Sequence, residues 1–332
     1  MARCSGFHSA SAEVRAASAV DIALWDLAGQ RQTVPTYVAM GGGMRDSIRV
    51  YNTCAGYSYN SGGTRRAPAA GEVPAGPYDD QIAFMHDAGA LAESLLSEGY
   101  TAMKIWPFDI HAARSGGQMI TLTELKSGME PFRKVRQTVG DSIEVMCELH
   151  SLWSSHAAIR ICRALEDVGV FWAEDPIAKM DDVRALADLR RQTRTPICGS
   201  ETLAGMVPFR DLLAADAIDV VMLDLTWCGG LTEGRKIAAL AEAHAKPLAP
   251  HDCTGPVALM AGLHLAIHSA NAIFQEVVRA ALSTWYRELV TELPVLRGGM
   301  ALAPTAAGIG TQLHPSVRTR KDAVVRTSGT PR

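Results

Sequence analysis

The stretch that decides the fold runs from residue 145 to residue 278. It contains six short segments: VMCELH (145–150), FWAEDP (171–176), ICGSET (197–202), VVMLDL (220–225), LAPHD (248–252) and FQEVV (274–278). Each segment is an apolar run with an ionisable residue near its end, and these residues recur every 23 to 27 positions. That spacing is the length of one strand, one helix and two loops. The recurring residues are Glu148, Glu174, Glu201, Asp224, His251 and Glu276.

This repeat predicts an α/β fold, either a (β/α)8 TIM-type barrel or its (β/α)7β variant. Strands buried on both faces are continuous apolar runs, and two more such runs come earlier, at 48–54 and 101–106. In a parallel barrel the carboxyl ends of the strands meet at one mouth, where active sites lie. One strand-end charge is as easily a solvated residue as a functional one, but six in phase favour a site.

Composition narrows the function classes. The chain has 332 residues, of which 48% are hydrophobic and 20% charged, with a formal net charge of −3. These values are ordinary for a globular enzyme and give no reason to expect nucleic acid or a membrane as a partner. No apolar run reaches the roughly 18 residues of a membrane span, and the N-terminus lacks the apolar core of a signal peptide. The seven cysteines form no CxxC pair, and several lie in apolar runs. We therefore expect a cytoplasmic protein with reduced cysteines.

The chain divides into three predicted parts. Residues 46–280 form the barrel, residues 1–45 precede it, and residues 281–332 form an irregular segment that packs back on it. A Gly- and Pro-rich loop at 56–77 is expected to be mobile and to cover the site. Residues 10–30 read as an amphipathic helix. Its predicted apolar face consists of Val14, Ala17, Val20, Ala23, Leu24 and Leu27.

Three carboxylates come from three adjacent predicted strand ends: Glu148, Glu174 and Glu201. Side by side they repel one another unless a cation neutralises them. Hard oxygen ligands suit Mg²⁺, which binds through a few carboxylates together with water and substrate oxygens. No cluster of cysteine and histidine recommends zinc. The sequence therefore predicts a Mg²⁺ site formed by these three residues.

Acid–base groups flank the predicted metal site. Asp224 and His251 lie on the next two strands, and a carboxylate bound to one imidazole nitrogen orients the ring for general acid–base work. On the other side lie His150 and Lys104. Lys104 stands inside an apolar strand; it either reaches the rim of the barrel or works in the site, and the second interpretation is favoured because the strand ends directly after it. By the two-residue period of a strand, Lys104 and Trp106 share a side. The set fits abstraction of a proton next to a carboxylate.

These residues resemble the enolase superfamily, and within it the mandelate racemase group. The motifs that carry the resemblance are the Lys104 strand and five longer matches: ASAVDIALWDLAG (17–29), AEDP (173–176), GSE (199–201), LDLTWCGGLTEGRKIA (223–238) and APHDCTGP (249–256). The resemblance implies that Glu148, Glu174 and Glu201 bind Mg²⁺ and that His251 and Asp224 form the acid–base dyad. It also implies that Glu276 hydrogen-bonds a substrate carboxylate, and that residues 1–45 are a remnant of an α+β capping domain that keeps only its last helix.

The subgroup follows from two positions. Racemases of the group carry a second lysine where this chain has Trp106, which is assigned here to substrate binding. The sequence ELH at 148–150 is similar to the acid-x-His pattern of sugar-acid dehydratases, although its first ligand is Glu rather than Asp. The resemblance implies a Mg²⁺-dependent hydro-lyase in which His150 expels the 3-hydroxyl of a sugar acid, and it suggests a homo-oligomer. The alternatives are a racemase or epimerase that uses His251 against Lys104, and an inactive barrel that binds a ligand.

Overall fold

The computed structural model describes residues 11–57, 59, 71–74 and 76–326. Most of the loop predicted at 56–77 lies outside the described residues. Eight parallel strands follow one another around a ring, each beside the next, and β8 pairs with β1. Between β7 and β8 the ring is closed by a bridge from Leu248 to Ala272 and by the bond from Ile273 N–H to Leu248 O. The strands are β1 (Ser47–Thr53), β2 (Ala102–Ile105), β3 (Glu144–Glu148), β4 (Ala173–Glu174), β5 (Ile197–Gly199), β6 (Val220–Leu223), β7 (Leu248–Pro250) and β8 (Gln275–Val277).

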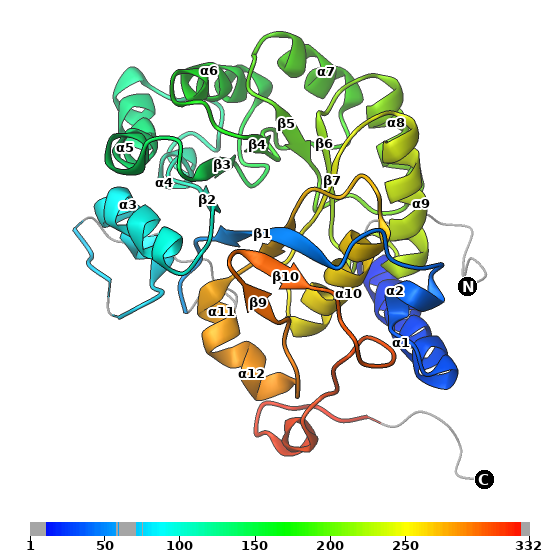
Figure 1. The fold of residues 1–332 in the computed structure, drawn as a ribbon. Coiled ribbons are helices and arrows are strands. Elements are labelled where there is room, and N and C mark those ends of the chain that lie inside the picture. Colours follow the sequence, from blue (N-terminus) through cyan, green and yellow to red (C-terminus); the bar gives the residue numbers. More distant parts are fainter. Residues whose placement is uncertain (1–10, 58, 60–70, 75, 327–332) are drawn as a thin grey trace.

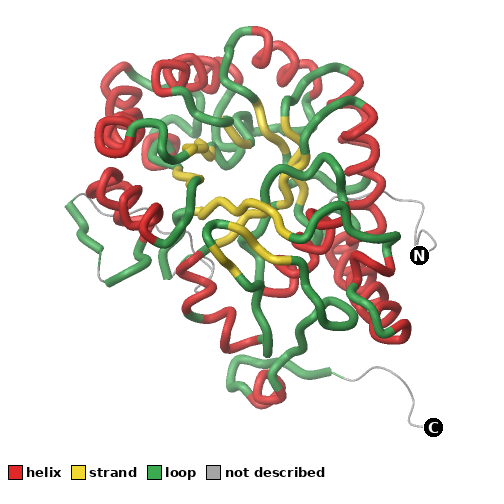
Figure 2. The backbone as a smooth tube through the Cα atoms, viewed as in Figure 1, coloured by secondary structure: helices red, strands yellow, loops and turns green. Residues whose placement is uncertain are grey.

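Helices form an outer ring around the strands, as Figure 2 shows. The α-helices are α1 (Ala12–Gln32), α2 (Thr36–Ala39), α3 (Asp80–Ser97), α4 (Asp109–Ala112), α5 (Leu122–Val139), α6 (Ser155–Leu165), α7 (Val183–Arg191), α8 (Met206–Ala214), α9 (Gly230–Ala243), α10 (Pro256–His268), α11 (Arg279–Ser283) and α12 (Trp285–Leu289). Short 3-10 turns lie at Glu166–Val168 and Pro315–Thr319. The short helices α11 and α12 follow β8. The closed ring of eight parallel strands inside a ring of helices confirms the predicted TIM-type barrel.

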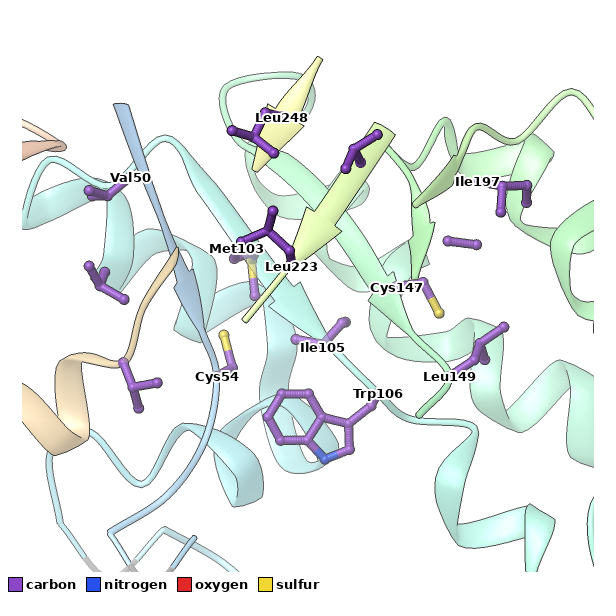
Figure 3. Close-up of a cluster of buried hydrophobic side chains, with 14 of the residues drawn as sticks. Val50, Cys54, Met103, Ile105, Trp106, Cys147, Leu149, Ile197, Leu223 and Leu248 are labelled. Atoms are coloured by element: carbon purple, nitrogen blue, oxygen red, sulfur yellow. The ribbon is translucent and has the colours of Figure 1, made fainter. Parts of the chain in front are cut away.

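The barrel has two hydrophobic layers, because successive strand residues point to opposite faces. The outer layer packs between strands and helices, and Figure 3 shows part of it, including Met103, Ile105 and Leu223. The inner layer fills the barrel below the mouth. It consists of Tyr51, Ala102, Met146, Trp172, Cys198, Val220, Met222, Ala249 and Phe274. This inner layer forms the floor of the site, because the charged residues at the strand ends lie directly above it.

The C-terminal segment returns to the barrel. β9 (Leu296–Arg297) and β10 (Met300–Leu302) form an antiparallel hairpin, and β10 pairs antiparallel with the first half of β1. The turn residues Gly298 and Gly299 both have positive φ, 54° and 74°, which side chains other than glycine rarely adopt. A Cβ on Gly299 would also lie 2.3 Å from the carbonyl oxygen of Gly99. The hairpin thus seals the amino end of the first barrel strand.

The predicted apolar face of the first helix is wrong. Val20, Leu24 and Leu27 are about half exposed, whereas Ile22 on the other side of α1 is buried. The helix docks on α9 with small and polar groups: the Ser18 hydroxyl accepts the Gly229 N–H at 3.0 Å, and Asp21 Oδ2 accepts the Thr232 N–H at 2.9 Å. Periodicity identified an apolar stripe but could not show that the opposite, more polar side supplies the contact.

The cysteines and helices of the described residues agree with the composition. Six cysteines are free there, and Cys147, Cys162 and Cys198 are buried as predicted. Within the same residues, no helix combines the length and the apolar character that crossing a bilayer requires. The strands β1 to β8 all lie inside the predicted 46–280 segment. The domain boundaries themselves remain predictions.

The burial of α1 gives a stability prediction with a built-in control. Ile22→Ala should lower the free energy of unfolding by about 2–4 kcal/mol, because it opens a cavity against the barrel. Leu24→Ala removes a half-exposed side chain from the same helix and should cost about 1 kcal/mol or less. Urea unfolding followed by circular dichroism measures both. Equal losses would show that Leu24 is as buried as Ile22.

A buried histidine predicts a loss of stability in mild acid. His264 of α10 accepts the Tyr37 N–H at Nδ1 and contacts Ile309 O through Nε2, both at 3.1 Å. Burial lowers the pKa of His264 to about 4, so protonation favours the unfolded chain. Neutral His264 makes its full contribution to the free energy of unfolding above pH 6.5. That free energy should fall by about 1.4 kcal/mol per pH unit between pH 6.5 and 4. Unfolding of His264→Gln should show a shallower pH slope in this window; an unchanged slope would contradict the prediction.

Candidate active site

Three buried carboxylates meet at the mouth of the barrel. Glu148 and Glu174 are the last residues of β3 and β4 and stand opposite each other in the strand register, and Glu201 follows two residues after β5. One oxygen from each lies within 4.8 Å of the others. Glu148 Oε1 accepts the backbone N–H groups of Leu149 at 3.0 Å and His150 at 2.6 Å. The predicted triad is thus brought together in a geometry that could hold a metal ion.

Lys104 lies among buried carboxylates rather than at the solvent-exposed rim. Its ammonium group is 2.5 Å from Glu174 Oε1, 3.0 Å from Glu276 Oε1 and 3.3 Å from Glu148 Oε2, and its side chain is buried. Although burial opposes its charge, Glu174 and Glu276 hold the pKa of Lys104 well above its usual value. A lysine that merely reaches for solvent would not be enclosed in this way. Lys104 therefore neutralises part of the negative charge at the mouth.

The carboxylates differ in how readily they ionise. Burial and the charge of Glu148 raise the pKa of Glu174 well above its usual value. Burial also opposes ionisation of Glu201, but the neighbouring His251 outweighs it and lowers the pKa of Glu201 to about 2. Within the triad, Glu174 therefore holds a proton more readily than Glu201 does. A divalent cation such as Mg²⁺ would remove this opposition to ionisation, and three converging carboxylates are hard oxygen donors that suit it.

His251 and Asp224 form a hydrogen-bonded pair. His251 Nδ1 is 2.8 Å from Asp224 Oδ2, and its Nε2 is 2.6 Å from Glu201 Oε2. The other Asp224 oxygen accepts the Thr226 N–H at 2.6 Å, and the Thr254 hydroxyl donates to Oδ2 at 3.1 Å. Burial opposes a proton on the ring, but Glu201 and Glu276 raise the pKa of His251 well above its usual value. The imidazole is therefore held in one orientation, with Nε2 facing the triad.

His150 is held by a second carboxylate. Its Nδ1 is 2.6 Å from Asp109 Oδ2, and its Nε2 is 3.2 Å from the Tyr59 hydroxyl. Trp106 packs edge-on against the ring with centroids 5.5 Å apart. The sequence does not single out Asp109, because nothing in its spacing links it to His150. The two histidines are therefore both paired with an aspartate.

Trp106 is placed differently from the prediction. Lys104 lies inside the barrel mouth, but β2 ends at Ile105, and Trp106 belongs to the outer hydrophobic layer. There it contacts Phe84 of α3 at 5.3 Å between ring centroids. Strict alternation of sides stops where the strand stops. The structure thus gives Trp106 a packing role beside His150, and its assignment to substrate binding remains a prediction.

Glu276 lies within β8, and its oxygens already have protein donors. Oε1 accepts from the Thr53 hydroxyl and from Lys104, and Oε2 accepts the Asp252 N–H at 2.9 Å. An ionised carboxylate only accepts hydrogen bonds. The predicted bond from Glu276 to a substrate carboxylate therefore requires a proton between the two groups.

A pocket of about 560 Å³ opens onto Glu201 and His251. The loops after β6 and β7, together with α1 and α12, form its walls. The remaining lining residues are Arg15, Thr226, Trp227, Cys253, Thr254 and Trp285. The pocket gives a small molecule access to one side of the triad, where the His251–Asp224 pair lies.

The mouth of the closed parallel barrel thus brings together a carboxylate triad that could hold a cation, a buried lysine and two aspartate-bound histidines. Such groups are typical of the active site of an enzyme. Comparisons of sequence identify the family. Residues 87–317 match the Enolase C-terminal domain-like family, and the chain belongs to that family. The resemblance to the enolase superfamily seen in the sequence is thereby confirmed.

Named relatives are sugar-acid dehydratases, which are hydro-lyases. The chain is 31% identical to D-xylonate dehydratase of Haloferax volcanii over 94% of its own length and 70% of the relative. It is 27% identical to D-gluconate/D-galactonate dehydratase of Picrophilus torridus, over 87% of the chain and 66% of the relative.

Solved structures agree with these relatives. An enolase protein from the environmental genome sequencing of the Sargasso Sea is 62% identical, with a TM-score of 0.87 over 99% of this chain and 81% of the other. A mandelate racemase subgroup enolase from Agrobacterium tumefaciens is 45% identical, with a TM-score of 0.82 over 96% and 77%. The chain thus spans between 66% and 81% of the length of these four proteins. Together the relatives and the fold identify an enzyme related to the sugar-acid dehydratases.

The floor of the site gives a prediction about metal affinity. The indole N–H of Trp172 donates to Glu174 Oε2 at 3.0 Å. Trp172→Phe keeps an aromatic ring but frees this oxygen, so the dissociation constant for Mg²⁺ should rise about tenfold or more. Calorimetric titration with MgCl₂ measures the change.

Trp153 supplies the matched control. It is also fully buried, but within the described residues its indole nitrogen has no hydrogen-bond partner. Trp153→Phe should therefore leave the Mg²⁺ affinity almost unchanged. Equal affinities for the two variants would show that the Trp172 bond does not orient a metal ligand.

Proposed function

We propose that the chain is a Mg²⁺-dependent dehydratase of a sugar (aldonic) acid. The observation that carries this proposal is the pair of aspartate-bound histidines: His251 with Asp224, and His150 with Asp109, linked by the triad that includes Glu201 and Glu148. Loss of water from neighbouring carbons needs a base for the proton and an acid for the hydroxyl. The relatives named as D-xylonate, D-gluconate and D-galactonate dehydratases support the same reaction.

The residues divide the work in the proposed reaction. Glu148, Glu174 and Glu201 would hold Mg²⁺, which when bound supplies positive charge beside the oxygens of the substrate carboxylate. His251 Nε2 removes the proton alpha to the carboxylate while Asp224 fixes the ring. The negative charge of Glu201 now stabilises a proton on the His251 ring. His251 can therefore act as the base only after that charge is neutralised. Lys104 adds positive charge next to the carboxylate oxygens, on which negative charge develops.

His150 completes the proposed reaction. It gives a proton to the departing 3-hydroxyl, the C–O bond breaks, and water leaves. The remaining enol becomes a 2-keto-3-deoxy acid. Asp109 holds His150 through Nδ1, so that Nε2 is the nitrogen available to a substrate. Tyr59, which contacts Nε2, would exchange this bond for the substrate hydroxyl.

The geometry favours this reaction over the alternative epimerase or racemase. An epimerase would use Lys104 as a second base against His251. Three carboxylates enclose the Lys104 ammonium group and hold its proton. A base must lose that proton. A bound cation would neutralise Glu148 and Glu174, but Glu276 at 3.0 Å is not among the proposed metal ligands and would still oppose the loss. His150 is the better second acid–base group, and it suits elimination. Assembly into a homo-oligomer remains a prediction of the family resemblance.

The proposed roles predict that substitutions of His251 and His150 affect exchange of the alpha proton differently. With a sugar acid and Mg²⁺ in D₂O, His251→Asn should abolish exchange of the alpha proton, seen by NMR, and formation of the keto acid. His150→Asn should keep the exchange but slow keto-acid formation by a factor of about 10²–10⁴.

The exposed residue His156 offers a control, because His156→Asn should leave both rates unchanged. Chelation of the metal should stop the wild type. If His251→Asn still exchanges the alpha proton, the assignment of the base is wrong. A screen of D-xylonate, D-gluconate and D-galactonate with a colour test for 2-keto-3-deoxy acids identifies the substrate to use.

A further inference from the structure

The pocket contains a cation that the proposed reaction does not use. Of its eight lining residues, Arg15 is the one with a permanent positive charge. Arg15 lies in the first turns of α1, the helix that packs beside α9 (Figure 1). Its side chain is exposed and lines the pocket. Within the described residues it forms no ion pair with a carboxylate. Its charge is therefore available to a ligand.

The guanidinium group is held in place by an aromatic ring. It stacks over Trp227 with 4.4 Å between its central carbon and the ring centroid. A guanidinium stacked on an indole keeps its N–H donors free at the edge of the plane, where they can bind a carboxylate or phosphate in a fork. A freely moving surface arginine would not be fixed in this way.

Trp227 also connects Arg15 to the reacting atoms. Its ring lies 5.8 Å, centroid to centroid, from the His251 ring. A substrate whose alpha carbon faces His251 would have its own carboxylate at the triad and Lys104. The rest of its chain can then run along Trp227 toward Arg15.

We propose that Arg15, held on Trp227, binds an anionic group at the far end of the substrate, so that the site prefers a sugar acid with a second negative charge. This inference rests on the proposed function, because it uses the orientation of the substrate in the dehydration. A neutral hydroxymethyl end would gain little from a guanidinium, whereas a second carboxylate or a phosphate ester forms charge-assisted hydrogen bonds with it. Arg15 is thus a specificity-determining residue.

Binding to matched ligands tests the proposal. Affinities are measured by calorimetry with Mg²⁺ in the His251→Asn background, which stops turnover. The ligands are the pairs gluconate and glucarate, and galactonate and galactarate, together with 6-phosphogluconate. Arg15→Met keeps an unbranched apolar stem but removes the charge and the fork. It should weaken binding of the dianions 10- to 100-fold and change binding of gluconate and galactonate less than twofold.

Two further variants sharpen the test. Arg15→Lys keeps the charge without the fork, so its affinity for the dianions should fall between those of Arg15 and Arg15→Met. Arg31→Met, an exposed arginine in the last turn of the same helix, should change nothing. Loss only for glucarate and galactarate identifies a second carboxylate as the group bound; loss only for 6-phosphogluconate identifies a phosphate ester.

Three results would overturn the proposal: equal weakening of all ligands by Arg15→Met, no weakening of any, or no measurable binding of the dianions. The proposed function is tested separately by keto-acid formation with Arg15 and His251 intact. If the dianions bind through Arg15 but none is dehydrated, the subsite stands and the dehydratase proposal fails. If gluconate is dehydrated at a rate independent of Arg15 and dianions do not bind, the dehydratase proposal stands and the Arg15 subsite fails.

Discussion

Repulsion among buried carboxylates is the constraint on which the mouth of this barrel depends. Glu148, Glu174 and Glu276 all lie around one ammonium group, and Glu201 lies against a protonated imidazole. Each of these charges would be costly to bury alone. Lys104 and His251 therefore act as internal counter-ions in the structure, and both stand where a substrate and a divalent ion would need room. Binding of both would rearrange the contacts of Lys104 and of His251 Nε2, whereas the bonds from Asp224 to His251 and from Asp109 to His150 can stay.

The same constraint explains why the inner layer of the barrel is so aromatic. Tyr51, Trp172 and Phe274 meet edge to face below the charges, with ring centroids 5.5 to 6.0 Å apart. Lys104 lies 5.5 Å above the Tyr51 ring, whose negative face favours a cation. Such a floor excludes water from beneath the site and strengthens the interactions above it. Packing and electrostatics are thus arranged by the same few strands.

The sequence predicted those parts of the protein that depend on regular spacing. The barrel, the triad and the His251–Asp224 pair all follow from apolar runs that recur with a charge at their end. Partners outside the strands left no such signal: Asp109, at the start of α4, binds His150, and Thr226 binds Asp224. The spacing of the apolar runs does not encode these contacts. The α1 helix shows a second limit. Its apolar stripe was visible, but which side docks depends on Ser18 and Asp21 meeting the start of α9, a fact of tertiary structure.

The first strand has a further consequence for how the chain is made. β1 pairs with β8 through Val50 and Gln275, and with β10 through Ser47 and Leu302. Its partners on one edge are therefore synthesised more than two hundred residues after it. During translation the edge of β1 that pairs with β8 and β10 keeps unpaired backbone groups while the strands from β2 onward leave the ribosome. Such an edge can pair with the wrong strand. The ring can close only when β8 has emerged, so a ribosome that stalls before Gln275 leaves an open sheet rather than a smaller barrel.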